Sequence, residues 1–139
     1  MAENEKIRVV IGKMGLDGHD RGAIVLSKML RDAGMEVIYT GLYQTADMMV
    51  ETAIQEDVDV VGLSFLSGEQ CYYTPKVIEL LREKGLNDIL VVVGGVIPRR
   101  DIPELKKAGV SEVFLPGAPI EDTISYIKQN VRKLKEVAQ

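Results

Sequence analysis

The chain has 139 residues, a formal net charge of -4, 46% hydrophobic residues and 5% aromatic residues. This length fits one domain with a core of ordinary size, and the acidic balance argues against nucleic-acid binding, which needs a basic surface. No apolar run approaches the ~20 residues of a membrane span, no secretory signal precedes the first apolar run, and the single cysteine fits a reducing cytosol. We expect one cytoplasmic domain over residues 1–139, with residues 1–5 disordered, that binds neither nucleic acid nor membrane.

Short β-branched runs alternate with longer helical stretches along the chain. The runs predicted to be strands are residues 7–11, 36–40, 58–64, 88–95 and 112–116. The stretches predicted to be helices are residues 21–34, 45–57, 74–85, 101–109 and 119–139. Several strands are nearly continuous Val, Ile and Leu, which is typical of parallel strands covered on both faces. The pattern predicts the α/β class: a flavodoxin-like (Rossmann-like), doubly wound, five-stranded parallel sheet of order 2-1-3-4-5 with helices on both faces.

Ligands of such sheets bind beyond the carboxyl ends of the strands, where the strand order reverses. Small and polar residues follow four of the predicted strands. They are Asp17, His19, Asp20, Arg21 and Gly22 after the first, Ser64, Leu66, Ser67 and Gly68 at the third, Gly94 and Gly95 at the fourth, and Gly117 after the fifth. Glycine and serine at these exits let the backbone approach a large ligand closely.

The usual ligands of this fold do not match these residues. The glycines after the first strand do not form G-x-G-x-x-G, and no phosphate-binding P-loop is present. Ser64 stands where a phospho-receiver domain would end its third strand in aspartate, and the loop after the first strand lacks the serines and threonines of a flavin phosphate loop.

His19 is the only histidine of the chain, and Asp17 lies two residues before it. A carboxylate bonded to one imidazole nitrogen makes the other nitrogen a better metal ligand. One His and one Asp are too few for a zinc site, which needs three or four protein ligands. The residues therefore favour either an axial ligand for a metal already held in a macrocycle or an acid–base histidine.

Three motifs together resemble the signature of cobalamin-binding domains of the base-off, His-on type. They are Asp17-x-His19-x-x-Gly22, Ser64-x-Leu66 and Gly94-Gly95, and their spacing agrees with that family. The resemblance extends from about Lys6 to the last helix.

The resemblance implies a role for each matching position. His19 would coordinate cobalt from the lower face, and Asp17 would hydrogen-bond to His19. Gly22 would let the following helix pack close to the nucleotide tail of the cofactor. Ser64 and Leu66 would line the pocket for that tail, and Gly94 with Gly95 would leave room for its displaced base. Asp20 and Arg21 would cap the helix, face the corrin amides or meet a partner.

The amino-acid sequence around His19 resembles that of the cobalamin domain of methylmalonyl-CoA mutase and related acyl-CoA mutases. This implies adenosylcobalamin as cofactor and an isomerase inactive without a separate large (β/α)8-barrel subunit that binds the acyl-CoA, in a hetero-oligomer. The segment after Ser64, with Cys71 and two tyrosines, departs from methylmalonyl-CoA mutases and leaves 2-hydroxyisobutyryl-, isobutyryl- and ethylmalonyl-CoA mutases open. The alternatives are a corrinoid carrier, storage or methyltransfer protein, and a flavodoxin-like domain for another ligand.

Overall fold

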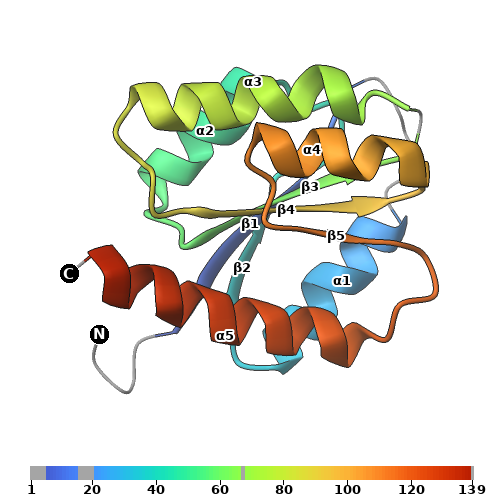
Figure 1. Cartoon of the computed structure of the whole chain (residues 1–139). Coiled ribbons are helices and arrows are strands. Elements are labelled where there is room, and N and C mark those ends of the chain that lie inside the picture. Colours follow the sequence, from blue (N-terminus) through green and yellow to red (C-terminus); the bar gives the residue numbers. More distant parts are fainter. Residues whose placement is uncertain (1–5, 16–20, 67, 139) are drawn as a thin grey trace.

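The structure, a computed structural model, describes residues 6–15, 21–66 and 68–138, except for the side chains of residues 21 and 132–138. The predicted disorder of residues 1–5 lies outside this described part. The strands form one parallel sheet in the order β2-β1-β3-β4-β5, which confirms the predicted topology (Figure 1). Their bounds are β1 Arg8–Lys13, β2 Glu36–Tyr39, β3 Val60–Phe65, β4 Leu90–Gly95 and β5 Glu112–Phe114.

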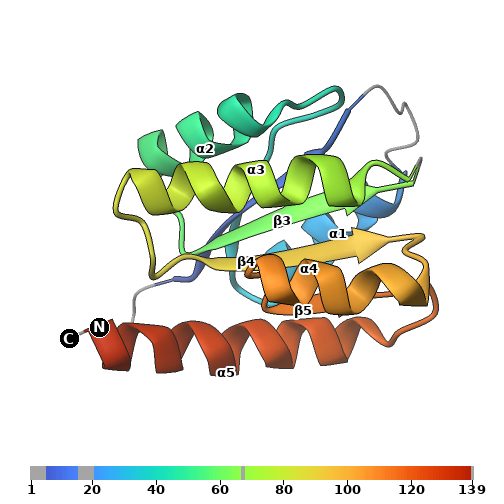
Figure 2. The same cartoon turned by 45° about the horizontal axis from the view of Figure 1, so that its top comes forward.

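Helices cover both faces of the sheet. Their bounds are α1 Arg21–Asp32, α2 Ala46–Gln55, α3 Gln70–Glu83, α4 Ile102–Ala108 and α5 Ile120–Ala138, with a short 3-10 helix, η1 Arg99–Asp101, before α4. Helices α1 and α5 lie on one face, and α2, α3 and α4 lie on the other (Figures 1 and 2). None of the described helices has the length and apolarity needed to cross a membrane.

Helix α3 begins earlier than the sequence pattern predicts. The predicted helix starts at Thr74, but α3 begins at Gln70 and contains Pro75. Proline removes one backbone donor, and at Pro75 that donor would serve the carbonyl of Cys71 within the opening turns of the helix. The burial of Gln70 and Thr74 against the rest of the protein accompanies this extra turn.

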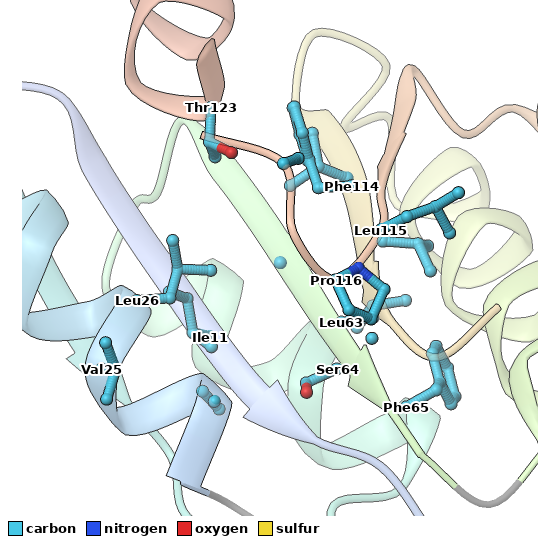
Figure 3. Close-up of a pocket in the computed structure, with 18 of the residues that line it drawn as sticks. Ile11, Val25, Leu26, Leu63, Ser64, Phe65, Phe114, Leu115, Pro116 and Thr123 are labelled. Carbon is cyan, nitrogen blue, oxygen red and sulfur yellow. The ribbon is translucent and has the colours of Figure 1, made fainter. Parts of the chain in front are cut away.

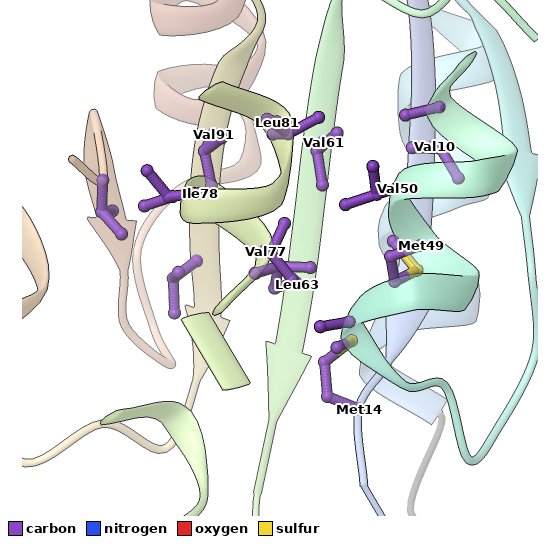
Figure 4. Close-up of a cluster of buried hydrophobic side chains, with 14 of the residues drawn as sticks. Val10, Met14, Met49, Val50, Val61, Leu63, Val77, Ile78, Leu81 and Val91 are labelled. Carbon is purple, nitrogen blue, oxygen red and sulfur yellow. The ribbon is translucent and has the colours of Figure 1, made fainter. Parts of the chain in front are cut away.

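The face under α2, α3 and α4 carries a continuous apolar core. Val61 and Leu63 of β3 pack in it with Val77 of α3 and with Met49 and Val50 of α2, and all five side chains are almost fully buried (Figure 4). The residues that alternate with these on the strands point to the other face and pack beneath α1 and α5. Near the carboxyl ends of the strands, fewer side chains fill this second core. The candidate site lies there.

Candidate functional site

A cavity of about 730 Å³ lies between the sheet and the helices α1 and α5. Its walls come from β1, β3 and β4, the segment from β5 into α5, and both helices (Figure 3). Val25, Leu66 and Val96 line it while each stays about half exposed, so these three side chains mark its opening. The cavity therefore opens at the carboxyl ends of the strands, where the topology predicts a ligand.

Missing side chains on the two central strands create the cavity. Ser64 of β3 pairs with Gly94 of β4 in the parallel register, and Gly62 lies two residues before Ser64, on the same face of the sheet. All three residues line the cavity. A strand usually fills this space with Val or Leu, so two glycines and one serine leave the sheet bare here.

The first turn of α1 contributes to the same open space. Gly22 lines the cavity, and a Cβ atom built on it would meet no heavy atom of the described residues within 4 Å. A Cβ atom on Gly94 would meet only the carbonyl oxygen of Phe114, at 3.6 Å. Packing against the described residues thus does not require glycine at Gly22 or Gly94, and the missing side chains leave room for a ligand.

The structure brings half of the sequence-predicted site residues together around this cavity. Gly22, Ser64, Leu66, Gly94, Gly95 and Gly117 all line it. Gly68 is described but does not line it, and Arg21 begins α1 without a described side chain. Asp17, His19, Asp20 and Ser67 lie outside the described residues.

Sequence reasoning named none of the other residues that line the cavity, among them Lys13, Gly62 and Thr123. With Ser64, Lys13 and Thr123 supply the only polar side chains among the described lining residues. Lys13 ends β1 and is 1% exposed, and Thr123 lies on α5 and is 5% exposed. Gly62 had a usable signal, because a glycine inside an apolar strand marks a bulge or the close approach of a ligand.

Gly95 has a backbone reason to be glycine. Its φ of 122° lies in a region that other residues rarely adopt, and a Cβ atom there would overlap the carbonyl oxygen of Phe65. The same carbonyl accepts a hydrogen bond from the backbone N–H of Val96, with N and O 3.2 Å apart. Gly95 thus closes the end of β4 against β3, and the cavity wall depends on this closure.

These features define a class of protein: an α/β domain that holds an organic ligand in an apolar cavity at the carboxyl edge of its sheet. The sequence matches the B12 binding domain family over residues 7–125, and the chain belongs to that family. This confirms the resemblance to cobalamin-binding domains noted from the motifs.

Two relatives match almost the whole chain. The 2-hydroxyisobutanoyl-CoA mutase small subunit of Aquincola tertiaricarbonis is 51% identical over 125 residues, which cover 90% of this chain and 92% of that one. The pivalyl-CoA mutase small subunit of Xanthobacter autotrophicus is 47% identical over 126 residues, covering 91% and 84% of the two chains.

A solved structure shows the same fold. A cobalamin-binding protein from Desulfitobacterium hafniense superposes with a TM-score of 0.78 at 21% identity, over 90% of this chain and 59% of that one.

Replacing Gly95 by Ala is expected to lower the free energy of unfolding by more than about 3 kcal/mol, because strained backbone adds to the overlap with Phe65. Gly34→Ala is the matched control, since Gly34 also has a positive φ, 95°, but its Cβ atom would meet nothing within 4 Å. This control should lose only about 1 to 2 kcal/mol. Urea unfolding of both variants measures the difference, and equal losses would contradict the role given to Phe65.

Proposed function

We propose that the chain is the cobalamin-binding small subunit of an adenosylcobalamin-dependent acyl-CoA mutase. The observation that carries the proposal is the cavity at the carboxyl edge of the sheet, in a chain that matches mutase small subunits over nearly their whole length. An enzyme of this kind is an isomerase, and this chain is the part of it that does not bind substrate.

The described residues fit the nucleotide tail of such a cofactor. The cavity walls are mostly Val, Leu, Ile and Phe, which suit the flat apolar rings of a benzimidazole base. Ser64 on the sheet and Thr123 on α5 add hydroxyl groups from opposite sides (Figure 3). The bare backbone at Gly22 and Gly94 provides the space that the tail would occupy.

The loop that carries the proposed cobalt ligand begins and ends at this cavity. Lys13, before the loop, and Gly22, after it, both line the cavity. We assign His19, within that loop, as the lower axial ligand of cobalt and Asp17 as its hydrogen-bond partner. A carboxylate in this role fixes the tautomer of the imidazole and raises its basicity. Asp20 and Arg21, which follow His19 in the sequence, would cap α1, face the corrin amides or meet the partner subunit.

This chain holds the cofactor, and a partner completes the enzyme. When bound, adenosylcobalamin supplies the carbon-centred radical with which the rearrangement of the acyl group begins. The residues around the cavity bury the tail and exclude water from it. A separate large subunit with a (β/α)8 barrel, a fold of ~250 residues, would bind the acyl-CoA. The two subunits work in the cytoplasm as a hetero-oligomer.

Replacing His19 by Ala should abolish the base-off, His-on spectrum that the wild-type chain gives with hydroxocobalamin, because no other imidazole is present in the chain. Asp17→Asn should keep the spectrum but weaken cobalamin binding about 10- to 100-fold, the usual effect of removing the partner of a ligating histidine. Absorbance titrations measure both, with Asp32→Asn at the end of α1 as control. An unchanged spectrum in His19→Ala would remove His19 from the cobalt.

Replacing Gly94 by Val should weaken cobalamin binding at least about tenfold, because the new side chain occupies the space left for the tail. Binding of cobinamide, which lacks the nucleotide tail, should stay the same. The paired titrations are read beside thermal unfolding, which reports whether the variant folds. Equal weakening for both corrinoids would show that the tail binds elsewhere.

A mutase subunit should form a stable complex with its large subunit, and acyl-CoA isomerisation should need both chains and adenosylcobalamin. Co-expression with the large subunit of a related acyl-CoA mutase, followed by size-exclusion chromatography and an activity assay, measures this. A corrinoid carrier would instead bind cobalamin with the same affinity, form no such complex and support no isomerisation.

A further inference from the structure

A second group of chemically active side chains lies away from the cavity, between α3 and α4. Cys71 stands in the first turn of α3, Asp101 ends η1 and Glu104 stands in the first turn of α4. Both helices cover the face of the sheet opposite the cavity (Figures 1 and 2). The group therefore joins the segments that follow β3 and β4, without being part of the cavity wall.

The three side chains direct their polar atoms to one point. The Cys71 sulfur and one carboxylate oxygen from each of Asp101 and Glu104 all lie within 4.8 Å of one another. The Cys71 thiol donates to Oε2 of Glu104, with the sulfur and oxygen 3.5 Å apart. These separations allow one ion to contact all three atoms after small side-chain rotations.

In the described part of the chain, no lysine or arginine side chain pairs with the carboxylates of this group. Neither Asp101 nor Glu104 forms an ion pair with a described lysine or arginine. Burial, the hydrogen bond to Glu104 and the charges of Asp101 and Glu104 raise the pKa of the Cys71 thiol to about 11. The same two charges that oppose a thiolate would favour a cation beside it.

The buried side chain of Gln70 lies beside this group and lacks one hydrogen-bond partner among the described residues. Its side chain is 2% exposed, and its Nε2 donates to Oδ2 of Asp101 at 2.8 Å, so its amide lies directly against the group. The Oε1 atom of the same amide is buried and accepts no hydrogen bond from the described residues. Ligating carboxylates are usually held by such a second hydrogen bond, and a buried oxygen without a donor is expensive unless a ligand or its water supplies one.

We propose that Cys71, Asp101 and Glu104 bind a divalent transition-metal cation of the zinc type, with water as the fourth ligand. A sulfur ligand disfavours Mg²⁺ and Ca²⁺, and a small set of mixed sulfur and oxygen ligands suits tetrahedral Zn²⁺. The thiol proton passes to solvent as the sulfur–metal bond forms. Gln70 holds Asp101 in place as a positioning residue. The bound ion ties the start of α3 to the start of α4 and so stiffens two segments at the carboxyl edge of the sheet.

The test uses the full chain, free of corrinoid and of metal, in the presence of a reductant. Titration with Co²⁺ should produce a sulfur-to-cobalt charge-transfer band that saturates at one ion per chain and disappears when Zn²⁺ is added. Cys71 is the only cysteine, so the band reports this site alone. Cys71→Ser should abolish the band and weaken Zn²⁺ binding at least about tenfold, and Gln70→Leu should weaken it about 10- to 100-fold.

Three controls make the outcome decisive. Glu79→Gln, an exposed carboxylate on the same helix outside the group, should leave the affinity unchanged. His19→Ala should also leave it unchanged, because the site does not use the histidine of the proposed cobalt site. Thermal unfolding without metal shows that each variant folds. Equal Zn²⁺ affinity in the wild type and Cys71→Ser overturns the proposal, and so does the absence of the charge-transfer band or loss of binding in His19→Ala. Because no corrinoid is present, these outcomes leave the proposed function untouched.

Discussion

The site depends on the absence of side chains at one place on the sheet. Protein interiors are packed to crystal-like density, so the layer between a sheet and its helices is normally filled by Val, Leu and Ile. Here Gly62, Ser64 and Gly94 leave the central strands bare beneath α1 and α5. Because the side chains of a strand alternate between faces, this opening does not weaken the opposite face, where Val61 and Leu63 stay fully packed.

The two faces of one sheet therefore serve different purposes. The core under α2, α3 and α4 supplies a rigid support, and the face under α1 and α5 carries the cavity. An apolar cavity forfeits the contacts that its lining side chains would otherwise make. A ligand that fills it restores those contacts, and by linkage it stabilises the folded chain. Holding the cofactor and stabilising the domain are thus one physical event in this protein.

The sequence predicts the fold closely because each level of the pattern agrees with the others. Continuous apolar runs set the parallel strands, and the sheet has the predicted order. The clearest displacement is the early start of α3, where apolar periodicity does not fix the first turn before Pro75. For the site, motifs located Gly22, Ser64 and Gly94. Thr123 escaped notice because periodicity shows that a helix has an apolar face, but not that one hydroxyl on that face borders a cavity.

Adjacent residues of one motif need not share a role, as Gly94 and Gly95 show. The resemblance implied that both make room for the displaced base. The space at Gly94 is open except for one ordinary contact with Phe114, so its bareness serves the cavity. Gly95 is glycine because its backbone and the carbonyl of Phe65 exclude any side chain, so it would be required even in a domain that binds nothing. Of the two, only Gly94 carries information about the ligand. Gly62, which belongs to none of the motifs, is an intermediate case, because it lines the cavity but a Cβ atom on it would lie 3.3 Å from Cγ1 of Ile11.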